Sequence, residues 1–483
     1  MMNGNRRRLR ALAVTLMVGA GMTTTMLTAS PGAARTRYTT TSIKIADGLT
    51  LLKVKDSRGP NRIRVLRIDP AKAVTIDVGL AGKVWPAYAP TSSIASAYGA
   101  IGAVNADFNG GAGRPLHAFL EDGTVATSGV SRRWIYGISD DETVNHMGYP
   151  RVRTDALDET RNRSKPVAAW NAGSPDTDEL AAYTSQGGTV ERPPKDACYA
   201  RLDADSAPLW TTDHVAIERE YVVAEHPCQH DALLPTDAKE VILASGSQTS
   251  TKAQWLKALA VGGKVRLTWE VTGWPDMLDI QGGMPLLVEN GNVVAPAHCG
   301  SSFCDRNPRT GVGYNSKTNR VYYITVDGRM STSVGMTLPE FARQFTRYGC
   351  DWALNFDGGG STTMVAKIPG SGLQVVNKPS GGNERPVPSV MLVLPGSDAG
   401  EPKSLSGGSA MLAGLAGMAP ATVPCACDPE AVLRAAIQDP GSTGGLMAAL
   451  ASGGLGFRGT LPPALRAIAE RYVAARELSG QPA

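Results

Sequence analysis

The chain has 483 residues, of which 42% are hydrophobic, 48 are Lys or Arg and 44 are Asp or Glu. The small positive excess lies in the first 34 residues, which hold four arginines and no acid, so the remainder balances 44 basic residues (48 − 4) against 44 acidic ones. This balance does not indicate a nucleic-acid partner, and an aromatic content of 6% does not favour a repeat that stacks on sugar rings.

Residues 1–34 have the pattern of a secretory signal peptide. Four arginines precede an uncharged apolar stretch at Ala11–Ala29, and small residues follow at Ser30–Ala34. The stretch could remain as a membrane anchor, but its Thr and Gly content and the small residues after it favour cleavage. The adjacent arginines also permit twin-arginine export. We therefore expect a secreted or cell-envelope protein with no stable transmembrane segment after cleavage.

Residues 35–396 are expected to form the main folded domain. Short apolar or alternating runs between turn signals predict strands. These runs are Thr41–Lys55, Asn61–Ile68, Val74–Leu80, Ile101–Asn105, Val215–Val223, Val241–Ala244, Lys264–Thr272 and Val321–Val326. The predicted helices are Ser92–Tyr98, Thr251–Leu259 and Thr337–Tyr348. Because strands and helices mix without a strict βαβ rhythm, we expect an α+β fold with mixed, largely antiparallel twisted sheets and a few packed helices.

The segment 155–197 is polar and irregular, and it contains four prolines. Such a composition is typical of exposed connections rather than of a core. We expect a surface insertion or the edge of a lid.

The seven cysteines agree with export to an oxidising compartment. Two pairs can form disulfides, Cys198 with Cys228 and Cys299 with Cys304. The odd number leaves at least one thiol free or paired between chains, and we expect Cys350 to be inert in the core. The Cys-Ala-Cys sequence at 425–427 has no nearby His and lacks zinc-ligand spacing.

The segment Leu354–Met364 (LNFDGGGSTTM) places an acid, three glycines and three hydroxyl side chains at the end of a predicted buried strand, Cys350–Phe356. Successive glycines let the backbone turn sharply and bring its N–H groups close to a bound group. A glycine-rich turn in which Asp357 caps a helix or loop fits the same residues.

Five other segments accompany this one in a set order. They are Asn105–Gly111 (NADFNGG), Gly282–Gly291 (GGMPLLVENG), Asp305–Gly313 (DRNPRTGVG), the predicted helix at Leu338–Phe345 and Gly382–Val387 (GNERPV). The ordered set resembles the phosphodiester glycosidase family over roughly residues 40–396. The resemblance implies that fold and a hydrolase that cleaves a glycosyl phosphodiester or a related glycosidic bond. The first motif departs from the family's NGGFF pattern, so the resemblance supports Asp107 less than Asp357.

A sugar 1-phosphodiester has a good leaving group, so its hydrolysis requires chiefly a cationic clamp for phosphate, a carboxylate near the anomeric carbon and a base for water. With the resemblance, the candidate catalytic residues are Asp107, Arg309 and Asp357, and the roles of the two carboxylates stay open. The candidate substrate contacts are Asn105, Asn109, Gly110, Thr310, Asp327, Asn355, Gly358, Gly359, Gly360, Ser361, Thr362, Glu384 and Arg385. We expect a carbohydrate or glycosyl-phosphate substrate, no metal or other cofactor and no nucleic acid.

The two arginines have structural alternatives. Arg309 can pair with Asp357 to hold two strand ends together. Arg385 can bridge to Glu384 or to another surface acid.

Asn105 and Asn109 can form turns, and the dipeptide at Asp327 is also a standard hairpin turn. The segment from Asp107 only faintly resembles a calcium loop, because the following ligand positions lack oxygens. The six histidines show no paired ligand spacing and are expected to be mostly surface or structural. The alternative function is a non-catalytic glycan-binding protein of the cell envelope on the same fold.

Beyond the domain, residues 397–426 are rich in Gly, Ala and Pro, and they predict a flexible linker. Residues 427–483 predict a short helical or partly disordered tail. The family resemblance does not extend to it.

Overall fold

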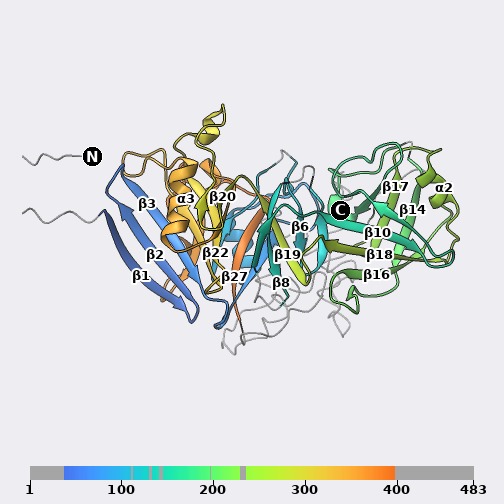
Figure 1. The fold of residues 1–483 in the computed structure, drawn as a ribbon, viewed down its shortest axis with the longest axis horizontal. Coiled ribbons are helices and arrows are strands. Elements are labelled where there is room, and N and C mark those ends of the chain that lie inside the picture. Colours follow the sequence, from blue (N-terminus) through green and yellow to red (C-terminus); the bar gives the residue numbers. More distant parts are fainter. Residues whose placement is uncertain are drawn as a thin grey trace, which may run out of the picture. The chain divides into compact units, whose positions relative to one another are not determined.

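The structure is a computed structural model that describes residues 37–109, 112–129, 133–140, 145–195, 197–228, 235 and 237–396. The chain divides into a unit at Met1–Gly414 and a unit at Leu415–Ala483, and every described residue belongs to the first unit. The expected signal peptide, linker and tail lie outside the described residues. Figure 1 shows the chain coloured along its sequence.

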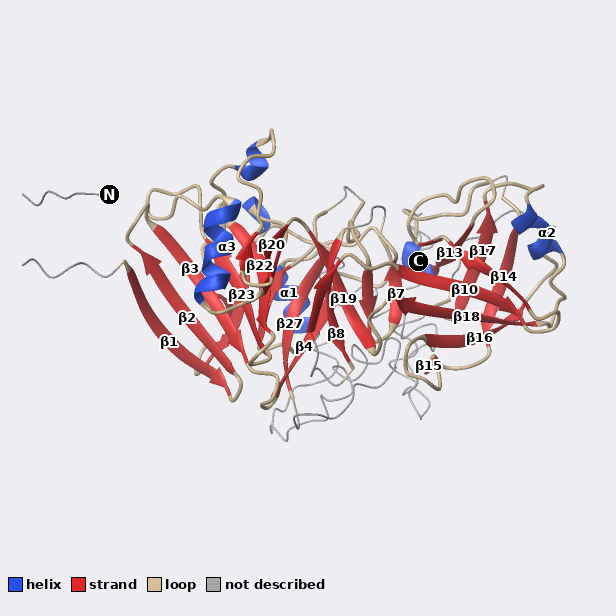
Figure 2. Cartoon of the chain, viewed as in Figure 1, coloured by secondary structure: helices blue, strands red, loops and turns tan. Residues whose placement is uncertain are grey.

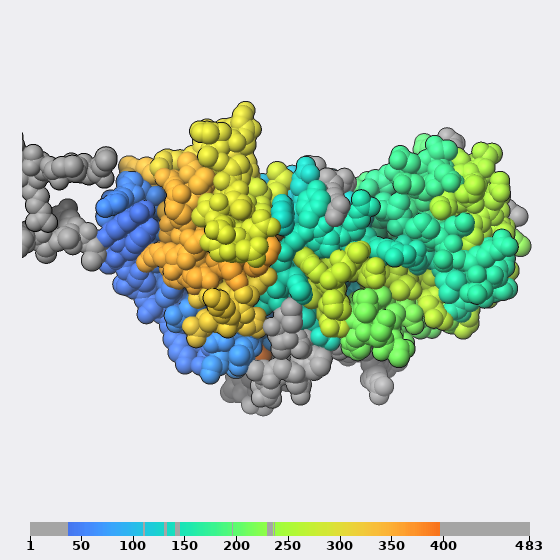
Figure 3. All heavy atoms as spheres, in the orientation of Figure 1, coloured from blue at the N-terminus to red at the C-terminus, as the bar shows by residue number. Residues whose placement is uncertain are grey.

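An eight-stranded sheet, the first sheet, joins the N-terminal strands to strands more than 200 residues later. Its strands in order are β1 (Tyr38–Ala46), β2 (Leu49–Asp56), β3 (Asn61–Ile68), β23 (Arg320–Val326), β22 (Arg309–Asn315), β24 (Trp352–Asn355), β20 (Leu286–Glu289) and β21 (Asn292–Val293). All neighbours are antiparallel. In the space-filling view the blue N-terminal residues accordingly lie against orange residues from late in the domain (Figure 3).

The long strand expected at Thr41–Lys55 is instead the β1–β2 hairpin. The chain reverses at Asp47–Gly48, where Gly48 has a φ of 95° that favours glycine. The Asp-Gly turn signal between two alternating runs accounts for the difference.

Helix α3 (Leu338–Arg347) covers one face of the first sheet. Thr337 and Glu340 form a capping box at its start, and Pro339 occupies its first turn. Its apolar residues Phe341 and Phe345 are buried with Ile63 and Val65 of β3. The predicted helix at Thr337–Tyr348 is confirmed.

The opposite face of the first sheet packs on a five-stranded second sheet. The order of the second sheet is β26 (Gly372–Val375), β25 (Met364–Ile368), β5 (Gly102–Asn105), β27 (Ser389–Pro395) and β4 (Val74–Leu80), again antiparallel. Leu51 and Leu66 of the first sheet share a buried cluster with Val104 and Met391 of the second. Helix α1 (Thr91–Ala97) packs on this sheet through Ile94.

Two more sheets complete the described part. The third sheet has the order β7 (Thr124–Thr127), β6 (Phe119–Glu121), β19 (Met277–Gly283), β8 (Trp134–Ser139) and β9 (Asn145–Gly148). The fourth has the order β11 (Arg163–Val167), β10 (Val152–Asp158), β18 (Lys264–Val271), β16 (Ile217–Val223), β14 (Tyr199–Ala204), β17 (Glu240–Ser245), β13 (Leu180–Thr184) and β12 (Ala169–Trp170), with β15 (Leu209–Trp210) beside β16 and α2 (Thr251–Lys257) packed on it. Figure 2 shows how strongly strands outnumber helices.

The expectation for residues 155–197 was wrong. These residues supply the second half of β10 and all of β11 to β13, and Trp170 and Leu180 lie in the core of the fourth sheet. Pro166 sits in β11, the edge strand, where a missing N–H removes no interior ladder bond. Prolines in this segment therefore do not indicate an exposed insertion, because an edge strand can contain one.

Among the described residues there are 27 strands and three α-helices, with three short 3-10 turns at Ser185–Gly187, Ser302–Cys304 and Gly359–Ser361. The expected antiparallel sheets with few helices are present. The helix content is too small for more than rough agreement with an α+β class.

Both expected disulfides form, with Cα–Cα distances of 4.6 Å for Cys198–Cys228 and 5.9 Å for Cys299–Cys304. Cys350 is buried and unpaired, as expected, and burial raises the pKa of its thiol. Within the described ranges, no helix has the length and apolar character needed to cross a bilayer.

Candidate active site

The turn after β24 brings together a carboxylate, a hydroxyl and a guanidinium. Ser361 Oγ donates to Asp357 Oδ2 at 2.6 Å, and Arg385 Nη2 donates to the same oxygen at 2.8 Å. Arg385 Nε also donates to Ser361 Oγ at 2.7 Å. The side chain of Asp357 is 18% exposed and that of Arg385 is 52% exposed. The carboxylate therefore lies below a cation that faces solvent.

The environment of Asp357 acts on its pKa in two directions. Burial raises the pKa of the carboxyl group, and it outweighs the hydrogen bonds of Ser361 and the charge of Arg385, which lower it. Removing the charge of Arg385 would raise the pKa further. The ionisation of this carboxylate thus depends on a partner that a ligand can approach.

The three glycines shape the turn and admit a second arginine. A Cβ on Gly358 would lie 2.6 Å from the carbonyl oxygen of Pro308, and Gly359 has a φ of 58°. Arg329 Nη2 lies 3.1 Å from where a Cβ of Gly359 would be, and Arg385 Nη1 lies 3.4 Å from that of Gly360. Two guanidinium groups therefore lie beside the turn. Arg329 was not among the predicted site residues, although it directly follows Asp327 and Gly328 in the sequence.

Asn105 holds this turn from below. Its Nδ2 donates to the Asp357 carbonyl at 2.7 Å, and its Oδ1 accepts from Thr310 Oγ1 at 2.8 Å and from Thr363 N at 3.0 Å. Asn105 and Thr310 are fully buried. These two candidate residues therefore lie next to Asp357 but support the backbone beneath it.

Arg309 is placed differently from the expectation. Its side chain is buried, with Nε donating to Met336 O at 3.0 Å and Nη2 donating to Phe303 O and Asp305 O, each at 2.7 Å. Burial lowers the pKa of its guanidinium to about 10. Among the described residues no ion pair joins Arg309 to Asp357. The hydrogen bonds of Arg309 therefore hold backbone segments in place and do not link two strand ends through a carboxylate.

Asp107 forms a buried pair with a histidine. Its carboxylate accepts from Phe108 N and His117 N, each at 2.7 Å, and lies 2.6 Å from His117 Nδ1. His117 is fully buried, and its Nε2 has no partner within the described part of the chain. A lone histidine carries no spacing signal, so only the fold identifies it as the partner of Asp107.

Three further candidates have polar groups engaged within the protein. Asn355 Nδ2 donates to Met284 O at 2.8 Å, which ties β24 to the segment before β20. Asp327 is buried, accepts from Lys378 N at 3.0 Å, and has its pKa raised by burial. Glu384 accepts from Ser92 N at 2.9 Å and so holds the start of α1. The bridge from Arg385 to Glu384, the structural alternative for this arginine, does not occur among the described ion pairs, and Arg385 pairs with Asp357.

The remaining candidates are also placed. Asn109 is exposed and accepts from Tyr88 Oη at 3.0 Å. Thr362 is buried at the end of the glycine turn, and its Oγ1 has no partner within the described residues. Gly110 lies outside the described residues.

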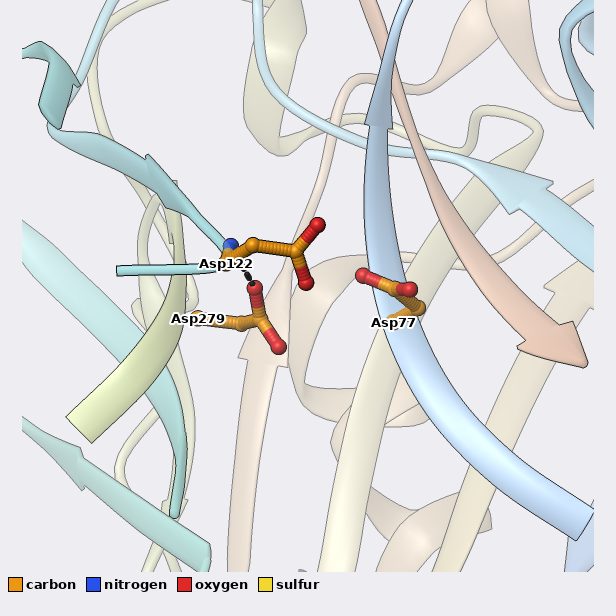
Figure 4. Close-up of side chains that lie close together, drawn as sticks. All are labelled: Asp77, Asp122 and Asp279. Carbon is orange, nitrogen blue, oxygen red and sulfur yellow. Dashed lines mark hydrogen bonds between the residues drawn. The ribbon is translucent and has the colours of Figure 1, made fainter. Parts of the chain in front are cut away.

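Three carboxylates elsewhere converge between the second and third sheets. Asp77 on β4, Asp122 after β6 and Asp279 on β19 offer oxygens that all lie within 4.8 Å of one another, and Asp122 N donates to Asp279 Oδ1 at 2.8 Å (Figure 4). Such oxygens suit a hard cation. None of the three carboxylates is without a partner of its own, so the cluster alone does not define a metal centre.

Residues 213–394 match the model of the phosphodiester glycosidase family. These residues belong to that family. The motif-based resemblance is thereby confirmed, and the matched range contains the glycine turn with Arg309, Arg329 and Arg385 but not Asp107. No curated protein matches the chain.

Several solved structures are similar to this chain. A hypothetical protein from Synechocystis aligns with a TM-score of 0.55 and 20% identity, over 74% of this chain and 63% of its own. A putative exported protein from Burkholderia pseudomallei has a TM-score of 0.49 and 22% identity, over 70% and 74%. The catalytic domain of zebrafish N-acetylglucosamine-1-phosphodiester alpha-N-acetylglucosaminidase, auto-inhibited by its pro-peptide, has a TM-score of 0.36 and 12% identity, over 74% and 88%. The first likeness shows a shared fold, and the chain spans 63% of the length of that structure.

Proposed function

We propose that the protein is a secreted or cell-envelope hydrolase that cleaves a glycosyl phosphodiester, or a related glycosidic bond, in an extracellular glycan. The observation that carries the proposal is the partly buried Asp357 carboxylate beneath the solvent-facing guanidinium of Arg385. The family match supports a glycosidase-type activity. The two disulfides fit an oxidising compartment.

The phosphate clamp in this proposal consists of Arg385 and Arg329. Guanidinium groups bind phosphate oxygens through paired N–H donors, and both groups lie beside the glycine turn. The phosphate leaves with the electron pair of its bond to the anomeric carbon. It departs as a stabilised anion, so strong acid assistance is not required.

Asp357 supplies the negative charge that faces the anomeric carbon as it becomes oxocarbenium-like. A phosphate that shares Arg385 takes one donor away from Asp357 Oδ2, which still accepts from Ser361 Oγ, while the guanidinium stays close enough to favour the ionised carboxylate. Water then bonds to the anomeric carbon and gives a proton to the departing phosphate, which leaves as a monoester dianion that can accept it. Asp107 is tied to His117, so we assign these two residues to positioning Phe108 and Asn109.

The test is turnover of a panel of sugar 1-phosphodiesters by the purified protein and by Asp357→Asn. We expect turnover to fall by about a hundredfold or more, because a positioned charge is lost from a partly dry site, while substrate binding survives. Asp47→Asn, at the exposed β1–β2 turn, is the matched control. Near-normal turnover by a folded Asp357→Asn variant would make Asp357 a structural turn residue. Binding without turnover by the parent protein would favour the glycan-binding alternative.

A further inference from the structure

Along β1, β2 and β3, one face of the first sheet is apolar at one end and cationic at the other. The face that packs on the second sheet carries apolar side chains at one end, such as Ile43, Leu51 and Leu66, which pair across β1, β2 and β3. Side chains two residues apart share a face. Farther along, the same face carries Thr39, Thr41, Lys53, Lys55, Arg62 and Arg64.

These six residues line a groove of about 360 Å³, here named the cationic groove. Strand register sets them in two rows: Thr41 opposite Lys53 opposite Arg64, and Thr39 opposite Lys55 opposite Arg62. Successive residues on one face of a strand are about 7 Å apart, and neighbouring strands are about 4.8 Å apart. Each row therefore holds a Lys beside an Arg, and the two rows repeat at about 7 Å.

The four cations have no ion pair with a carboxylate in the described part of the chain. The acids of the neighbouring turns and strand ends pair elsewhere, Asp56 with Arg37, Asp47 with Lys44 and Asp69 with Arg320. Arg64 donates to the carbonyls of Val376 at 2.8 Å and Ile63 at 3.1 Å.

Asp327 is the carboxylate whose charge acts on both Arg62 and Arg64, but it is buried and accepts from Lys378 N. Like charges held in one concave site repel each other unless an anion occupies it.

The cationic groove and the glycine turn are neighbours through one segment of chain. The carbonyl of Val376 accepts from Arg64 in the groove, whereas Asn377 Nδ2 donates to Thr362 O, at the end of the glycine turn, at 3.0 Å. Asn377 Nδ2 also donates to Asp327 Oδ1 at 3.3 Å. Exposed Lys378 follows in the same segment.

We propose that the cationic groove binds a glycan chain whose negative charges are phosphodiesters, so that a polymeric substrate extends from the glycine turn into the groove. This proposal rests on the proposed function. Arg62 can fork onto phosphate oxygens, the two lysines and Arg64 add positive charge, and the threonines offer hydroxyls to sugars. No aromatic side chain lines the groove, which disfavours the base stacking used by single-stranded nucleic acids.

The test is binding of a short synthetic oligomer of hexose units joined by phosphodiester links. Measurements use the full chain carrying Asp357→Asn, so that affinity is read without cleavage. We expect this oligomer to bind more tightly than a neutral oligosaccharide, a uronate oligomer or single-stranded DNA of equal length. We expect its affinity to fall with added salt, as for other polyanions.

The groove variant is Lys55→Gln with Arg62→Gln in that background, and we expect it to weaken binding by about tenfold or more and to flatten the salt dependence. The matched control is Arg67→Gln with Lys317→Gln, which removes the same charge from the opposite face of β3 and from a turn, and should bind like its parent. Thermal unfolding checks that both variants fold.

Equal affinity in the groove variant and its parent would overturn the proposal, and so would preference for DNA or for the uronate. Because binding is measured in the Asp357→Asn background, absence of turnover in the unsubstituted protein is a separate result. It would contradict the proposed function and leave the binding result to stand.

Discussion

Two arginines of the candidate site have different roles, and the difference lies in the groups that their donors reach. Arg309 is buried and donates to three backbone carbonyls, whereas Arg385 is half-exposed and donates to Asp357 and Ser361. A buried carbonyl without its donor lowers stability, whereas an exposed donor is free to exchange partners.

Arg309→Lys should therefore lower stability. A single ammonium cannot reach carbonyls on both sides of the guanidinium, and the loss should be about 1–3 kcal/mol in the free energy of unfolding. Arg385→Lys should leave stability within about 0.5 kcal/mol and raise KM for a sugar phosphodiester. Urea unfolding and steady-state kinetics measure both. A stable Arg309→Lys variant with a raised KM would place Arg309 on the substrate after all.

Glu121 should make stability depend on pH. The pKa of its carboxyl is raised from 4.5 to about 7, chiefly by burial and also by the charges of Asp122 and Asp279. The hydrogen bond that Tyr98 donates at 2.6 Å and the charge of Lys83 act in the opposite direction. The folded protein keeps a proton that the unfolded chain releases. Stability should thus fall as pH rises from about 4.5 to about 7, by at most about 3 kcal/mol, less what partial exposure to water screens.

Glu121→Gln removes this ionisation but keeps an oxygen for Tyr98. We expect the variant to be more stable than the parent at pH 8 and nearly equal to it at pH 4, measured by denaturant unfolding at each pH. Exposed Glu179→Gln is the control and should show no such trend. An equal stability difference at both pH values would mean that Glu121 does not titrate in this range.

At the scale of elements, the capped start of α3 is linked to the candidate site through Arg309. Its first residue follows the cap Thr337, and the carbonyl of the preceding Met336 accepts from Arg309 Nε. Thr337→Ala should cost about 1 kcal/mol of stability through loss of the cap. Combined with Arg309→Lys, the two losses should deviate from additivity, because both substitutions loosen the same turn. A double-mutant cycle in urea measures this, and strict additivity would show that the cap and Arg309 act independently.

Local patterns predicted elements well where signals were strong and unopposed. The strands at Asn61–Ile68 and Val74–Leu80 have the expected bounds, because alternation or apolar runs were flanked by turn residues. Strand β11 in the segment 155–197 was missed, because an edge strand tolerates a proline that a local pattern counts against it. Pairing between distant strands has no local signal at all.

The site was predictable in its residue types but not in its hydrogen bonds. Asp357, Ser361 and Arg385 lie together, because two motifs, Leu354–Met364 and Gly382–Val387, converge on one turn. Arg309 and Glu384 also belong to the motifs, yet Arg309 donates to a backbone carbonyl and Glu384 accepts from a backbone N–H. A motif names the side chain, and only the fold shows which partner it has.

At the scale of the molecule, the described domain should depend on β27 and not on the residues after Gly396. Ser389–Pro395 is hydrogen-bonded on both sides, to β5 and to β4. A chain ending at Gly396 should fold, and a chain ending at Pro388 should not, since it loses an interior strand of the second sheet. Circular dichroism and size-exclusion chromatography distinguish the two. Failure of the longer chain to fold would mean that residues after Gly396 stabilise the domain.

The pairing of β4 with β27 also fixes when the protein can fold during its synthesis. Val74–Leu80 is made early, but its partner Ser389–Pro395 appears some 300 residues later. At ribosomal rates this delay is about 15–60 seconds. During that time the apolar side chains of the early strands have no sheet to enter and are exposed to aggregation. The nascent chain therefore has to be kept from aggregating until β27, its last described strand, has been synthesised.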